Sequence, residues 1–378
     1  MAVEKKRPRG LKGSAKAKAN KKSKVDETPS EIPENAQTVV IDKVVEEGDE
    51  VGEAAALYES AIEKLGKFSQ RDAAAALPLL RGTIHESDRI LRNHESSSPL
   101  PALFYFTYGA ALYELGRLTE DEEFEPYLDA AQERLNTGLE LNDATMEDKI
   151  RLALAKIWLA QAASAISQGD EQVDTIPALS TQALATLDSV IAKGDVPAKT
   201  MIELADIVQN HGDLYEDFTS REVFRVWAED ALNKVLEKEP ENASALSELG
   251  LCQLSLANYH LDHEEEDDDE EEEEEEEEAK TVLTQGEQKA YDAILNSKGY
   301  FETAKDLLVK SNQVSPQILS DLAETLLNQA NLVLKEEEQL EIYHRVVENI
   351  KEANALIAEK NLDFILPEAL TSFLEEFE

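Results

Sequence analysis

The stretch "WAEDALNKVLEKEP", residues 227–240, has a spacing that indicates how this chain folds. Ala228, Leu232 and Val235 fall on one face of a helix, and Pro240 follows five residues after Val235. A small residue at the first position lets a second helix approach closely, and the proline ends the helix. This pattern is typical of the second helix of a tetratricopeptide repeat.

The same spacing, which we call the repeat frame, recurs along most of the chain. At a fixed distance after it comes a motif expected in the first helix of the next tetratricopeptide repeat. Tyr105-x2-Tyr108-Gly109 and Leu246-x2-Leu249-Gly250 place a glycine where two helices would cross closely. We therefore predict an all-α fold, a tetratricopeptide-like solenoid of helical hairpins. The predicted repeat-packing residues are Gly109, Ala131, Ala183, Ala228, Pro240, Gly250, Ala304 and Pro316.

Local signals predict individual helix ends. Ser315 before Pro316 predicts an N-cap followed by proline at the first helical position. Threonine with glutamate three residues later has the spacing of a capping box. A glycine such as Gly299 predicts the end of a helix. The two threonine–glutamate pairs are Thr119 with Glu122 and Thr284 with Glu287.

The repeat spacing is irregular, which predicts long insertions between helices. Successive small residues of the frame are 44 to 76 residues apart, against about 34 in a plain repeat. The longest interval contains residues 264–278, all Asp or Glu, which repel one another and have nothing to bury. We expect a disordered acidic insert at about 262–280 within a helical-repeat domain over 51–378. Residues 1–50 are expected to be a disordered basic arm and linker.

Charge separates this arm from the rest of the chain. The whole chain carries a net charge of -43, whereas residues 1–24 contain ten Lys or Arg and one acid. The body is therefore so acidic that nucleic-acid binding is disfavoured, except weakly through the arm. Basic proteins are the partners that such a body would attract.

The arm contains two basic clusters at the spacing of a bipartite nuclear import signal. "KKR" (5–7) and "KKSK" (21–24) are separated by thirteen residues. Two groups of Lys and Arg on a tether suit an import receptor. A basic arm that contacts RNA or the chain's own acidic run is an alternative, and both roles can hold together. The import-like residues are Lys5, Lys6, Arg7, Lys21, Lys22 and Lys24.

No pattern in the sequence indicates catalysis, a cofactor or a metal. There is no glycine-rich phosphate loop, no His-Glu-x-x-His and no cysteine pair. His260 and His263 are spaced to share a metal, but we favour the simpler interpretation of a helix end that runs into a charged loop. The single cysteine, Cys252, excludes an intramolecular disulfide and suits a reducing compartment. No signal peptide or membrane span is expected.

The chain resembles the fungal enhancer of translation termination family. The resemblance lies in "KKRPRGLKGSAKAKANKKSK" at the start, a helical body beginning near "GEAAALYESAIEKL", and an acidic run among the helices. It implies a nuclear, non-enzymatic protein, with shuttling to the cytoplasm left open. It also implies a role in accurate stop-codon termination, beside a prolyl hydroxylase of a ribosomal protein, with effects on hypoxic transcription.

Three classes of function remain at this stage. The first is a nuclear adaptor whose partners are the termination machinery, ribosome-associated factors or a prolyl hydroxylase, with an import receptor on the arm. The second is an acidic nuclear chaperone for histones or ribosomal proteins. The third, a cochaperone that holds peptide C-termini in a basic groove, is disfavoured because the body is acidic.

Overall fold

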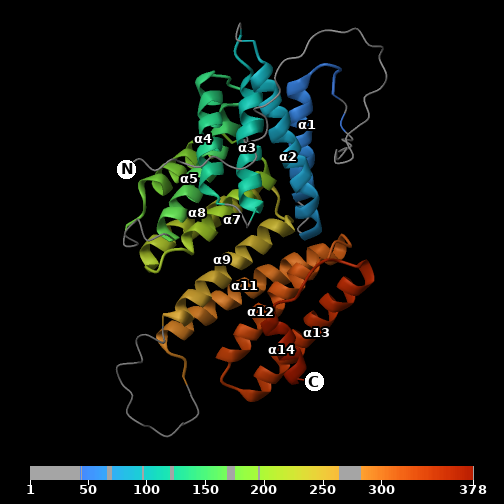
Figure 1. Cartoon of the computed structure of the whole chain (residues 1–378). Coiled ribbons are helices and arrows are strands. Elements are labelled where there is room, and N and C mark those ends of the chain that lie inside the picture. The colour runs from blue at the N-terminus through green and yellow to red at the C-terminus, as the bar shows by residue number, and fades with distance from the viewer. Residues whose placement is uncertain are drawn as a thin grey trace, which may run out of the picture. The chain divides into compact units, whose positions relative to one another are not determined.

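In a computed structural model, regular structure is entirely helical over the part that is described, namely residues 43, 45–65, 70–95, 98–119, 123–167, 175–194, 196–263 and 282–377. Consecutive helices pair as hairpins (Figure 1). The predicted all-α class and its sequential hairpins are therefore confirmed. The expected disorder of the arm and the acidic insert concerns residues outside these ranges.

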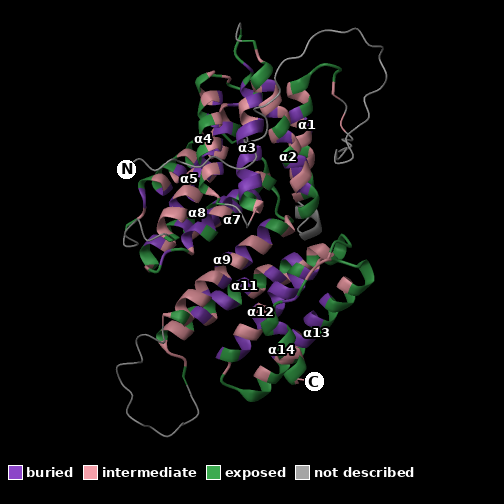
Figure 2. Ribbon diagram, viewed as in Figure 1, coloured by how far each residue is buried: buried purple, intermediate pink, exposed green. Residues whose placement is uncertain are grey.

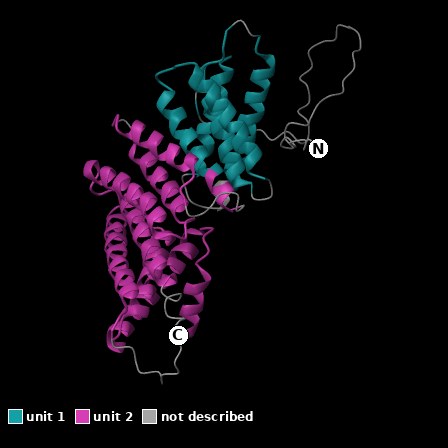
Figure 3. Cartoon of the chain, turned by 90° about the vertical axis from the view of Figure 1, so that its left-hand side faces the viewer, with its two compact units in different colours: residues 1–161 teal, residues 162–378 magenta. Residues whose placement is uncertain are grey.

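The chain divides into two compact units, residues 1–161 and 162–378, shown in Figure 3. The division falls within α5. The prediction of one continuous repeat domain over 51–378 concerns how the units join, and it stays a prediction. The helices of the first unit, with α5 reaching past its end, are α1 (Glu50–Leu65), α2 (Gln70–Asn93), α3 (Ala102–Leu118), α4 (Glu125–Glu140) and α5 (Glu147–Ser167).

The first unit is built around α3, which has the sequence "ALFYFTYGAALYELGRL". A helix that is apolar on nearly every side is stable only when neighbours surround it. Helix α3 pairs with α4 and also contacts α1 and α2, and Figure 2 shows it as a largely buried segment. Phe104, Leu135 and Ile150 are almost fully buried and join α3, α4 and α5 in one core.

The second unit contains three successive hairpins, α7–α8, α9–α11 and α12–α13, with α14 against the last of them. Alanines at the crossings are fully buried, which allows the close approach that the repeat frame requires. The helices here are α6 (Ala178–Ile191), α7 (Ala198–Gly212), α8 (Phe218–Lys238), α9 (Ala243–Asp262), α11 (Gln285–Lys310), α12 (Pro316–Leu332), α13 (Glu336–Lys360) and α14 (Glu368–Phe377).

Helix ends agree with the sequence at some positions and not at others. Thr284 forms a reciprocal capping box with Glu287, and Ser315 caps α12 ahead of Pro316, as predicted. Thr119 instead ends α3, where its hydroxyl donates to the carbonyl of Leu115, so its prediction as an N-cap was wrong. Gly299 lies inside α11, because packing against α9 and α12 continues the helix through it.

Candidate functional site

The predicted repeat-packing residues occupy different environments. Residues 109 and 250 are buried glycines: a Cβ on Gly109 would lie 2.7 Å from Leu135 Cγ, and one on Gly250 would lie 2.7 Å from Phe301 Cε1. These contacts bring α3 onto α4 and α9 onto α11. Pro240 is exposed and follows the end of α8, so it terminates a helix rather than filling a crossing. The residues of the set that are buried besides the glycines are Ala131, Ala183, Ala228, Ala304 and Pro316.

The six import-like residues of the arm lie outside the described residues, as does the acidic run 264–278. Their roles stay predictions. The polar groups that the structure does place together are in the second unit, and sequence analysis did not single them out.

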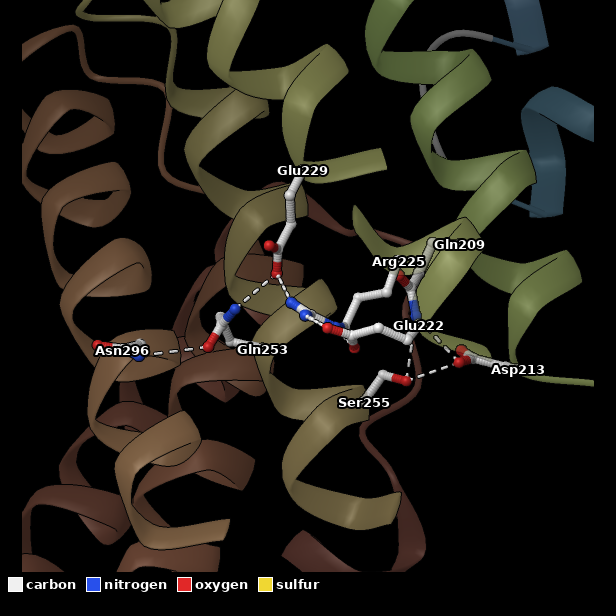
Figure 4. Close-up of polar contacts among 8 residues, drawn as sticks. All are labelled: Gln209, Asp213, Glu222, Arg225, Glu229, Gln253, Ser255 and Asn296. Atoms are coloured by element: carbon white, nitrogen blue, oxygen red, sulfur yellow. Dashed lines mark hydrogen bonds and ion pairs between the residues drawn. The ribbon is translucent and has the colours of Figure 1, made fainter. Parts of the chain in front are cut away.

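A first polar cluster joins α8, α9 and α11 (Figure 4). The guanidinium of Arg225 lies between two carboxylates of its own helix, with nitrogen–oxygen distances of 2.6 Å to Glu222 and 2.5 Å to Glu229. Gln253 donates to Glu229 at 2.6 Å and accepts from Asn296 at 3.3 Å. Burial alone would lower the pKa of Arg225, but the hydrogen bonds and charges of the two glutamates outweigh it and raise the pKa. The cluster fixes how three helices pack.

A second cluster joins α7 to α9 and to the start of α8. The hydroxyl of Ser255 donates to Asp213 at 2.7 Å, and Arg221 lies 2.6 Å from the same carboxylate. The Arg221 guanidinium also lies over the ring of Tyr259, 5.2 Å from its centre. The amide nitrogen of Gln209 donates to Asp213 and Ser255, whereas its buried carbonyl oxygen accepts no hydrogen bond from the described residues (Figure 4).

Carboxylates gather beside this second cluster, on one face of α7, α9 and α12. Asp206 and Asn210 on α7 are followed at helical spacing by Asp213, the residue directly after the helix. Glu248, Ser255 and Tyr259 share helical spacing on α9. Direct contacts link the three helices: Ser255 reaches Asp213, and Asn258 of α9 reaches Asn328 of α12 at 3.4 Å. We call Asp206, Asp213, Glu248, Asp321 and Glu324 the carboxylate face.

Burial and like charge perturb the acids of this face. Burial, with the charges of Asp206 and Asp321 adding to it, raises the pKa of Glu248 to about 8. Burial likewise raises the pKa of Asp321 to about 7, with the charge of Glu324 in the same direction, although a hydrogen bond from Gln317 opposes the rise. No Lys or Arg of the described chain pairs with Glu248, Asp321 or Glu324. Burial and like charge therefore favour the protonated forms of Glu248 and Asp321, so this face carries less charge at neutral pH than its number of carboxylates implies.

These shifts predict a pH dependence of stability with a definite sign. Between the ordinary glutamate pKa of 4.5 and about 8, folded Glu248 keeps a proton that the unfolded chain has released. Stability therefore falls as pH rises through this window. We expect Glu248→Gln to raise the free energy of unfolding by on the order of 1–2 kcal/mol at pH 8, with little change near pH 4.5.

Denaturant unfolding at both pH values measures this effect. Glu338→Gln on the exposed start of α13 removes the same charge and serves as the control. An equal gain at both pH values, or an equal gain in the control, would contradict the assignment of the buried proton to Glu248.

The histidines and the cysteine of the second unit take part in packing. Tyr259 stacks on His263 at 3.9 Å, and Phe218 contacts His260. Burial raises the pKa of the Cys252 thiol, with nearby carboxylates adding to the rise, so this thiol is not activated. Among the described residues, no three His, Cys, Asp or Glu side chains are grouped to hold a metal ion.

No helix in the described ranges is long and apolar enough to cross a membrane.

Comparison with known proteins connects this architecture to one family. Residues 1–182 match the family model described as Nuclear pore complex subunit Nro1. "Negative regulator of ofd1" of Schizosaccharomyces pombe is 37% identical over 137 residues, which is 34% of each chain. "Enhancer of translation termination 1" of Scheffersomyces stipitis is 30% identical over 249 residues, 55% of this chain and 53% of the relative. Residues 1–182 of this chain are therefore similar to the Nro1/Ett1 family.

The match to the family's curated members is partial along the chain. It spans about a third of the length of the first relatives, 34% of the S. pombe protein and 30% of the Lodderomyces elongisporus "Enhancer of translation termination 1". The fold extends further. A solved structure described as the S. pombe nuclear import adaptor Nro1 aligns with 87% of this chain and 99% of its own, with a TM-score of 0.51 and 23% sequence identity. At that identity, the similarity shows a shared fold.

Proposed function

We propose that this chain is a non-enzymatic nuclear adaptor that promotes accurate translation termination and acts beside a prolyl hydroxylase. The observation that carries the proposal is the family match over residues 1–182, because it includes the basic arm as well as the first helical unit. Relatives named for translation termination support the role in termination. The relative named for negative regulation of ofd1 supports the role beside a prolyl hydroxylase. A structural neighbour described as a nuclear import adaptor supports a carrier role.

The architecture suits such a role. Stacked helical hairpins present extended surfaces to other proteins, and both units contain such hairpins. The arm would bind an import receptor, and the body would hold the partner. Effects on hypoxic transcription would follow from the role beside the hydroxylase, and a solved structure described as the hypoxic regulator of sterol synthesis Nro1 supports a link to hypoxia.

Loss of the chain should raise stop-codon readthrough. If the adaptor supports termination, a deletion strain will decode stop codons as sense more often, while the rate of sense-codon decoding stays the same. A dual-reporter assay measures both. Re-expression of the wild-type chain should restore termination. Readthrough equal to that of the parent strain would contradict the role in termination.

The second candidate is an acidic chaperone for histones or ribosomal proteins. The observation that favours it is the net charge of -43, which would attract basic clients. Purified partners separate the two functions: free histones or unassembled ribosomal proteins would favour the chaperone, whereas termination factors or a hydroxylase would favour the adaptor.

A further inference from the structure

The described chain enters the first unit along one side of α1. Val45 lies on Gly52 near the start of the helix, where a Cβ on the glycine would lie 3.1 Å from Val45 Cγ1. Two residues earlier in the chain, the Lys43 ammonium lies 2.6 Å from Glu59 and 2.9 Å from Glu63, toward the other end of α1. The entering chain therefore runs antiparallel to α1, and residues 43 and 45 both face the helix.

The same side of α1 carries small and apolar side chains beside its glutamates. Ala56 follows Gly52 at helical spacing and is only 6% exposed, as expected beneath the entering chain. Ala55 and Ile62 share one flank of this side, and both are half-buried. Ile62 is not among the side chains that pack against the described core of the unit. It is therefore available to a segment that continues past Lys43.

The sequence before Lys43 has the pattern of such a segment. Residues 38–42, "TVVID", lie outside the described ranges and are rich in β-branched residues, which favour extended chain over helix. In an extended chain, residues two apart face the same side. Ile41 would therefore face α1 together with Lys43 and Val45, whereas Val40 would face away.

Lengths along the two segments agree with this register. Four residues of extended chain, from Val45 back to Ile41, cover about 13 Å. The ten residues from Gly52 to Ile62 cover about 15 Å of helix. Ile41 would therefore reach the level of Ile62.

We propose that residues 38–42 dock along α1 with Ile41 against Ile62. The occupant is this chain's own segment, because the ion pairs of Lys43 hold the chain on α1 one residue away and so give the segment a high effective concentration there. A hairpin at the end of a helical stack has no neighbouring hairpin on its outer side. The docked segment would cover that side of the first described hairpin.

Docking would also shorten the tether of the import-like clusters. Without it, residues 25–42 join Lys24 to the folded unit and can span up to about 65 Å. With it, only residues 25–37 remain free, and they span up to about 45 Å. A receptor bound to the arm would then stay closer to the first unit. The docking itself does not rest on the proposed function, because the purified chain is enough to test it.

Disulfide formation between two introduced cysteines tests the facing of the segment. The full chain first receives Cys252→Ala, which removes its single native cysteine. One variant then carries Ile41→Cys with Ile62→Cys, and its matched control carries Val40→Cys with Ile62→Cys. In a glutathione redox buffer, we expect the ratio of disulfide to dithiol to be about tenfold higher for position 41 than for position 40. Equal ratios, whether high or low, would overturn the proposal.

A double-mutant cycle tests the contact without cysteines. Circular dichroism verifies that each variant is folded, and the midpoint of denaturant unfolding is the measurement. Ile41→Ser and Ile62→Ser should each lower the midpoint, and together they should lower it by less than the sum, because both remove the same contact. Val40→Ser should leave it nearly unchanged. Additive losses, or an equal loss in Val40→Ser and Ile41→Ser, would overturn the proposal.

Discussion

Gly250→Leu should lower the free energy of unfolding by about 1–3 kcal/mol, toward the upper end of that range. Even a Cβ at position 250 would approach the Phe301 ring to 2.7–2.9 Å, and Phe301 is fully buried, so the ring has nowhere to move. Gly109→Leu should behave alike, because its Cβ would meet Leu135 Cγ at 2.7 Å and the carbonyl oxygen of Ala131 at 3.0 Å. Thermal or denaturant unfolding measures both variants.

The same hairpin offers a control with the opposite sign. Gly299 lies inside α11, and a Cβ there would have no atom within 4 Å. Gly299→Ala should therefore raise stability by up to about 1 kcal/mol through helix propensity alone. Gly109→Leu and Gly250→Leu as stable as wild type would contradict the close helix crossings on which the hairpin packing rests.

Neutralising both basic clusters of the arm should abolish nuclear enrichment of the chain. The changes Lys5→Ala, Lys6→Ala and Arg7→Ala, with Lys21, Lys22 and Lys24 also changed to Ala, remove the charges that an import receptor would bind. None of these residues lies in a described helix, so circular dichroism should be unchanged. The nuclear-to-cytoplasmic ratio of a tagged chain measures the effect.

The residues between the clusters provide a matched control within the same arm. Lys12→Ala, Lys16→Ala and Lys18→Ala remove as much charge as Lys5→Ala, Lys6→Ala and Arg7→Ala, yet leave both clusters intact. The control should remain nuclear. If the six-residue variant stays nuclear in cells that lack other copies of the chain, the arm is not the import signal.

The repeat frame in the sequence was sufficient to predict the fold class. Its positions are filled by small and apolar residues at fixed spacing, and the spacing survives long insertions because each hairpin needs only its neighbours. The boundary within α5 could not be predicted, since this helix continues through it with an apolar pattern on both sides. Gly299 was misassigned because the contacts of α11 with two neighbouring helices outweigh a local signal.

The carboxylate face could not be predicted from the sequence. Glu248 and Asp321 are two of 80 acids, and nothing in their immediate neighbours distinguishes them. They become distinctive only when α9 and α12 pack side by side and remove both from water. Sequence analysis instead singled out the acidic run and the arm, because their charge patterns are formed by residues that are consecutive in the chain.

Affinity purification of the tagged chain, followed by mass spectrometry, tests the adaptor role most directly when wild type is compared with the variant whose six import-like residues are changed to Ala. We predict that a prolyl hydroxylase or termination factors co-purify with both chains, and that an import receptor co-purifies with wild type alone. Recovery of only free histones or unassembled ribosomal proteins, or an import receptor bound equally to both chains, would contradict the account.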